Sequence, residues 1–165
     1  MSIDARIVAA FSKRVSPEEW IESVVASEEE REVLELKAKA LCLQDLSFYD
    51  ERSDVFHLLP SNAYVVVLPM VMRSSLAAID AGVLGKYSLL SLDSVVDWLG
   101  QPVCPDLFSK RFINVWGKMS ISELCVAEDW LWYVLDCGYR DEDGVARALE
   151  MLEYLKGHVI SRKRF

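Results

Sequence analysis

Two consecutive amphipathic patterns near the end of the chain constrain its fold more than any other feature. Residues 120–138 open with a serine–glutamate capping box and end in a glycine, and residues 141–157 open on three acidic residues and also end in a glycine. Two helices joined by so short a link are expected to be antiparallel neighbours. Their predicted apolar stripes are Leu124, Ala127, Leu131, Val134 and Leu135, and then Val145, Ala148, Leu149, Leu152 and Leu155.

Further helices are predicted before this pair. Residues 3–11 place apolar side chains on one face, and two capping boxes start helices that run from 16 to about 26 and from 27 to about 44. One kinked helix is the alternative for the latter two. A short helix is expected at 91–99, closed by a glycine and a proline, while residues 101–118 are predicted as a loop with a partial turn.

The segment from 54 to 81 is open to two interpretations. Three consecutive valines at 65–67 have strand propensity and are compatible with a buried strand. Alternatively, Ser61 caps a short helical stretch, Pro69 opens a new helix, and Gly82 ends that helix. We favour the helical interpretation.

Composition sets the broad class of the protein. The chain has 165 residues, of which 52% are hydrophobic and 10% aromatic, enough for a core without disulfides or metals. We therefore predict an all-α, single-domain bundle of six to seven irregularly packed helices over residues 1–165. The longest apolar run, 63–72, is interrupted by a proline and is too short to span a bilayer, and the N-terminus lacks a signal-peptide pattern. We expect a mature, cytoplasmic protein without a membrane partner.

The acidic charge is unevenly distributed along the chain. The net charge is −8; residues 1–59 carry seven basic and thirteen acidic side chains (net −6), residues 60–120 five and four (+1), and residues 121–165 six and nine (−3). Such a surface repels nucleic acid and anionic membrane, and it favours rapid encounter with a basic protein. Ordinary solubility is the simpler explanation of the same charge.

No catalytic or metal-binding pattern is evident. The four cysteines form no CxxC pair and there are only two histidines, His57 and His158, so no metal-ligand spacing exists and a reducing compartment fits best. The run at 80–87 lacks the spacing and the hydroxyl residue of a phosphate-binding loop. We expect no catalytic residue, no metal and no cofactor, and we place His158 at the C-terminus of the last helix.

Residues 58–76, with the sequence LLPSNAYVVVLPMVMRSSL, combine an apolar pair, a capped turn with an aromatic residue, and a Leu-Pro pair that opens a helix. A serine-capped long helix with a leucine and aromatic cluster follows, and then a final helix. This arrangement resembles a family of small all-helical bacterial proteins of unknown function, over about residues 55–155. The resemblance implies helix at 62–80 and carries over no catalytic residue.

One face of the predicted helix at 120–138 stands apart from its apolar stripe. Glu128, Trp132 and Asp136 share this face, and Asp129 lies beside it. An exposed tryptophan among charged residues has the composition of an interaction anchor. The competing interpretation is that the aromatic residues of this helix all belong to the core. A second candidate surface is the acidic run Glu28, Glu29 and Glu30, whose charge the helix dipole also explains.

These observations favour a non-catalytic, acidic helical protein that binds a protein partner. Its most concrete form is a bacterial immunity protein that neutralises a basic toxin. The alternative is a ligand-binding or enzymatic helical domain, with a pocket assembled from the scattered residues Tyr64, Arg73, His57 and Trp116. An acidic secretion chaperone is a third class, although the lack of strands speaks against its common α/β type.

Overall fold

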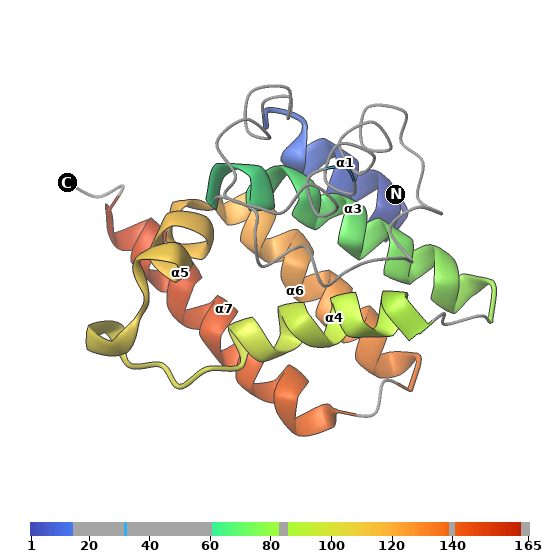
Figure 1. Cartoon of the computed structure of the whole chain (residues 1–165). Helices are drawn as coiled ribbons and strands as arrows, with labels where there is room; N and C mark the ends of the chain where they lie inside the picture. Colours follow the sequence, from blue (N-terminus) through green and yellow to red (C-terminus); the bar gives the residue numbers. More distant parts are fainter. Residues whose placement is uncertain (15–31, 33–60, 83–85, 139–140, 163–165) are drawn as a thin grey trace. The chain divides into compact units, whose positions relative to one another are not determined.

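Every regular element in the described part of the chain is helical (Figure 1). The computed structural model describes residues 1–14, 32, 61–82, 86–138 and 141–162. Within these residues there is no strand, which confirms the predicted all-α class. The elements are α1 (Ile3–Phe11), α3 (Ser61–Asp80), α4 (Lys86–Leu99), α5 (Lys110–Val115), α6 (Ile121–Asp136) and α7 (Glu142–Arg162), with short 3-10 helices at Pro105–Leu107 and Trp116–Lys118.

The chain divides into two compact units. Met1–Ala10 and Asp93–Phe165 form the first unit, and Phe11–Leu92 forms the second. The first unit contains α6 and α7, so the predicted interaction face of α6 lies in it. A single domain over residues 1–165 stays a prediction. The predicted helices over 16–26 and 27–44, apart from residue 32, and the acidic residues Glu28 to Glu30 lie outside the described residues.

Local signals define the ends of α6 and α7 as predicted. The Ser120 side chain accepts from the backbone N–H of Glu123, and the Glu123 carboxylate accepts from the backbone N–H of Ser120, which completes the capping box. Gly138 adopts a left-handed φ of 87° after the end of α6, as a terminating glycine should. At the start of α7, the Asp141 carboxylate accepts from the backbone N–H of Gly144 over 2.9 Å.

Helices α6 and α7 make the most extensive contact between described elements, and they run in opposite directions (Figure 1). This confirms the predicted antiparallel pair. Of the ten residues in the two predicted stripes, only Leu135 and Leu149 are half-buried, and the others are buried. Burial of an aliphatic side chain contributes roughly 1.5–3 kcal/mol, so this pairing is a major source of stability for the first unit.

The segment with the valine run is a helix, as we favoured, and it is longer than predicted. Helix α3 runs without a break from Ser61 to Asp80 and contains Pro69 in its interior. The prediction that Pro69 opens a separate helix was therefore wrong. An internal proline costs about 3 kcal/mol. Buried apolar residues on both sides of Pro69, from Val65 to Met72, offset that cost by packing.

The same helix corrects our expectation about membrane-spanning length. Within the described residues, the window Ala63–Asp80 is long and apolar enough to cross a bilayer, with a mean hydropathy of 1.4. The only charged residues of this window are Arg73 and Asp80, so they end the apolar run without lowering the mean hydropathy far. Two thirds of the window is buried inside the chain, as in the core helix of a soluble protein, and such helices pass the same test.

Three element boundaries differ from prediction. Helix α4 begins at Lys86, five residues before the predicted start. The predicted loop at 101–118 contains α5, because the Ser109 side chain caps it by accepting from the backbone N–H of Phe112 over 3.0 Å. Helix α7 continues past Gly157 to Arg162, so His158 lies within the helix rather than after it. A glycine inside a helix costs only about 1 kcal/mol relative to alanine, and the helical turns on both sides of Gly157 can offset this cost.

Gly157 provides a test of this extension. A β-carbon added there would meet nothing within 4 Å, so Gly157→Ala should remove only the conformational freedom of glycine. We expect it to raise the free energy of unfolding by about 0.5–1 kcal/mol, measured by urea denaturation.

Gly144→Ala is the matched change near the other end of α7. Its β-carbon would overlap the Asp141 carboxylate and break the cap, a loss of about 1 kcal/mol that cancels the gain in helix propensity. Equal stabilisation by both variants would contradict this assignment of the two glycines.

Candidate functional site

The predicted interaction face of α6 places one tryptophan at the surface. Trp132 is 51% exposed, whereas Trp130, two residues earlier on the same helix, is fully buried. Two residues turn an α-helix by about 200°, so the two indoles point in nearly opposite directions. The interpretation that all aromatic residues of α6 belong to the core is therefore wrong for Trp132. Asp136, one turn further along, is also exposed.

Glu128 on this face is engaged by the neighbouring helix. Both of its carboxylate oxygens accept from the Lys156 ammonium over 2.9 Å, which ties α6 to α7. The Lys156 side chain is 15% exposed and the Glu128 side chain 26% exposed, so solvent screens the attraction between their charges only partly. Burial acts to lower the pKa of Lys156, but its hydrogen bonds to Glu153 and Glu128 outweigh burial and raise the pKa above the ordinary value.

Asp129 is engaged from a different direction. Its carboxylate forms an ion pair with the guanidinium of Arg6 on α1, also in the first unit. Both side chains are more than a third exposed, so the pair is worth only about 0–1 kcal/mol. Of the four predicted residues on α6, Glu128 and Asp129 thus have intramolecular cations, while Trp132 and Asp136 are exposed and have no ion pair among the described residues.

A second site lies between α7 and the segment before α6. It is a pocket of about 210 Å³ that the side chains of two stretches line, one at 105–117 and one at 154–159. Of the nine described residues that line it, seven are apolar or glycine, and the other two are Tyr154 and His158. The lining consists of Pro105, Phe108, Phe112, Ile113, Gly117, Tyr154, Leu155, His158 and Val159.

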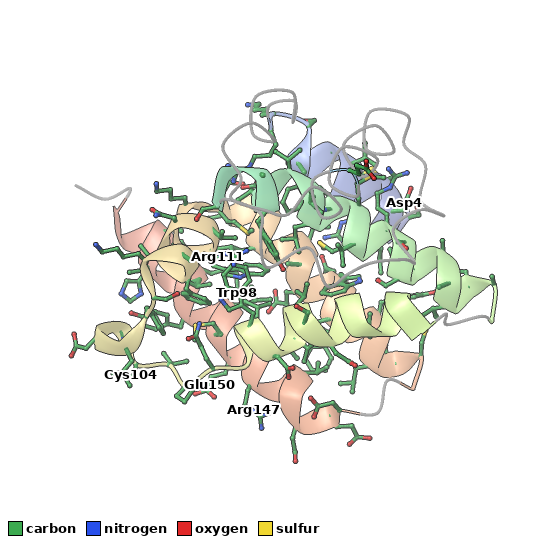
Figure 2. All side chains as sticks on the ribbon, viewed as in Figure 1. Asp4, Trp98, Cys104, Arg111, Arg147 and Glu150 are labelled. Carbon is green, nitrogen blue, oxygen red and sulfur yellow. The ribbon has the colours of Figure 1, made fainter. Side chains whose placement is uncertain are left out.

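Packed aromatic rings support one wall of this pocket. Phe112 is fully buried, and the ring of Trp98 meets it edge-on at 6.2 Å between centroids. Trp98 also meets Trp116 edge-on at 6.2 Å, and the Arg111 guanidinium lies 5.4 Å from the Trp98 ring (Figure 2). Phe112 therefore belongs to the packed core directly behind the pocket.

The polar part of the pocket is a hydrogen-bonded pair on α7. The Tyr154 hydroxyl lies 3.0 Å from His158 Nε2, and His158 Nδ1 lies 3.2 Å from the backbone carbonyl of Tyr154. A carbonyl can only accept, so Nδ1 carries a proton and, in the neutral ring, Nε2 accepts from the tyrosine hydroxyl. The tyrosine oxygen then retains the capacity to accept one more hydrogen bond.

The sequence predictions missed this pocket for an identifiable reason. Its residues come from the stretch predicted as loop and from the part of α7 on both sides of Gly157, where the helix was predicted to end. The Ser109 cap was the available signal for α5. Of the four residues proposed for an assembled pocket, His57 is outside the described residues, and the other three do not line this pocket: Tyr64 and Arg73 lie on α3, and Trp116 is fully buried.

Within the described ranges, no group of three or more histidine, cysteine or acidic side chains is placed to hold a metal ion. Comparison of the chain with protein-family models, with curated proteins and with solved structures gave no match. The resemblance to small helical bacterial proteins therefore stays a hypothesis.

The two tryptophans of α6 provide a paired test of these assignments. Trp130→Ala should lower the free energy of unfolding by about 3–5 kcal/mol, because it leaves a large cavity in the core. Trp132→Ala should change it by less than about 0.5 kcal/mol, as is usual at the surface. Denaturant titration of both variants measures the difference, and a large loss with Trp132→Ala would place that indole in the core.

The ion pair between Lys156 and Glu128 makes a pH-dependent contribution. Lys156→Met should lower the free energy of unfolding by about 1–3 kcal/mol, since it leaves a carboxylate largely buried without its cation. The pKa of Lys156 is raised in the folded chain, so the stabilisation is full below pH 10.5 and is lost as pH rises through the raised pKa.

Unfolding measured across alkaline pH checks this sign. The gap between the wild type and Lys156→Met should stay constant near neutral pH and shrink only above pH 10.5. A gap that already shrinks at neutral pH would contradict the assignment.

Proposed function

We propose that this chain is a non-catalytic helical protein that binds a basic protein partner through the face of α6 that carries Trp132. In its most concrete form, the proposal is that of an immunity protein, which neutralises a toxin in the bacterial cytoplasm. The single observation that supports it best is the half-exposed indole of Trp132, on a helix whose other tryptophan is buried.

A large aromatic side chain at the surface is a strong anchor for a protein interface. Tryptophan is enriched among residues that dominate binding energy, and its removal at such a position costs about 2 kcal/mol or more. Leaving an indole half in water forgoes part of the hydrophobic stabilisation that burial provides. A partner that covers Trp132 recovers this free energy, and Asp136 beside it offers a charge for the rim of the interface.

The ion pairs of α6 distinguish the acidic residues that stabilise the fold from those that can bind the partner. The Glu128 pair is largely buried and holds α6 on α7, so we assign it a structural role. The Asp129 pair is exposed, and a basic side chain of the partner can replace Arg6 at small cost. The overall charge of −8 attracts a basic partner over distances near the Debye length, which speeds association at low salt.

The test uses a nuclease or other basic toxin encoded next to this chain. The combined variant Trp132→Ala with Asp136→Lys should weaken the complex by about thirtyfold or more, measured by calorimetry. Added salt should slow association of the wild type, because the steering is electrostatic.

Matched controls are available outside α6. Leu107→Ala also removes a strongly exposed apolar side chain, and Glu150→Lys makes the same charge reversal on the exposed side of α7. Both should leave affinity within about twofold of the wild type. Equal weakening by the controls, or an adjacent toxin that does not bind, would count against the proposal.

A further inference from the structure

The aromatic pocket between residues 105–117 and the end of α7 has no role in the protein interface proposed above, and none of its residues is shared with that face. We propose that this pocket binds a small planar aromatic molecule of one or two fused rings, which carries a single hydrogen-bond donor. The size, the lining and the polar pair of the pocket each restrict the ligand.

Volume sets the size of the ligand. An apolar cavity of about 150 Å³ holds benzene, whereas pockets for drug-sized ligands measure about 300–1,000 Å³. At about 210 Å³, this pocket suits a substituted ring or a fused bicycle such as indole, and it is too small for a nucleotide.

The arrangement of rings favours a flat aromatic ligand over an aliphatic one. Phe108 is tilted by 45° against Phe112, with centroids 4.8 Å apart, and it meets Tyr154 nearly at right angles, at 75°. Phe108 and Tyr154 are both partly exposed, so two rings nearly at right angles border one space, and the fully buried Phe112 packs against Phe108. Offset and edge-on contacts with such rings stabilise an aromatic ligand beyond simple burial of its surface. Phe108 also rests on Phe112, which is fully buried and in edge-on contact with Trp98, so this side of the pocket is backed by packed core.

The polar pair specifies a donor. Tyr154 and His158 are the polar side chains among the described lining residues, and when His158 is neutral their mutual hydrogen bond uses the donor of the tyrosine. The remaining lone pair of the Tyr154 oxygen can only accept. An indole or phenol meets this requirement with one N–H or O–H, and an N-methylated analogue does not.

Titration of the full chain with 5-fluoroindole, followed by fluorine NMR, tests the proposal. For ten non-hydrogen atoms we expect a dissociation constant between about 1 μM and 1 mM. Gly117→Leu should weaken binding by about tenfold or more. Gly117 lines the pocket outside the left-handed region, and its added β-carbon makes only an ordinary contact with Ile113, so the longer side chain can extend into the space.

Gly157→Leu is the matched control, since it makes the same chemical change on the exposed side of α7 and away from the lining. It should bind 5-fluoroindole as the wild type does. Val159→Trp is the second filling variant, for the case that Gly117→Leu does not fold, as judged by circular dichroism. Unchanged binding in a folded filling variant overturns the proposal. So does the absence of binding to the wild type up to about 10 mM ligand, roughly ten times the weakest dissociation constant expected above.

Two further experiments test whether the ligand donates a hydrogen bond to Tyr154, and whether the aromatic group belongs to a small molecule or to a protein side chain. Tyr154→Phe should weaken indole by about fivefold and leave 1-methylindole unchanged, which a merely structural role of the hydroxyl would not produce. N-acetyltryptophanamide should bind more weakly than indole, because its backbone groups exceed the volume of the pocket. Tighter binding of the amide would assign the pocket to a side chain of a partner protein and overturn the small-molecule proposal.

Discussion

The packing of α6 against α7 is the interaction on which the rest of the first unit depends. The apolar stripe of α6, from Leu124 to Val134, and that of α7, from Val145 to Leu155, bury each other. Because one face of each helix is fixed in this contact, the direction of every other side chain on the pair follows from helical geometry. Trp130 is turned into the core and Trp132 away from it for this reason.

The charges near this pair are divided between structure and surface. Lys156 reaches across to Glu128 in a largely buried pair, so that acidic residue supports the contact of the two helices. Arg6 on α1 covers Asp129 in an exposed and weak pair. An acidic stripe in the sequence therefore becomes a mixed surface, in which the indole of Trp132 is the more distinctive feature and the acidity acts mainly through long-range attraction.

The aromatic pocket depends on the same pair in a different way. With the apolar stripe of α7 packed on α6, residues 154–159 still have a side that faces the segment at 105–117. Phe112 and Phe108 reach this side because Ser109 caps α5 and sets the direction of its short helix. The pocket thus requires a long α7 and an ordered α5, and neither was predicted: glycine at 157 favoured a helix end, and six helical residues leave almost no periodic pattern.

The sequence by itself determined the helical class, the capping box at Ser120, the terminating Gly138 and the antiparallel pair, because local hydrogen bonds and apolar periodicity set these features. It also placed Trp132 off the apolar stripe. Only the tertiary structure decided that α3 runs through Pro69, that α7 runs past Gly157, and that Glu128 and Asp129 are paired. These outcomes depend on contacts between residues far apart in the chain, whose packing energy exceeds the local preferences that a sequence displays.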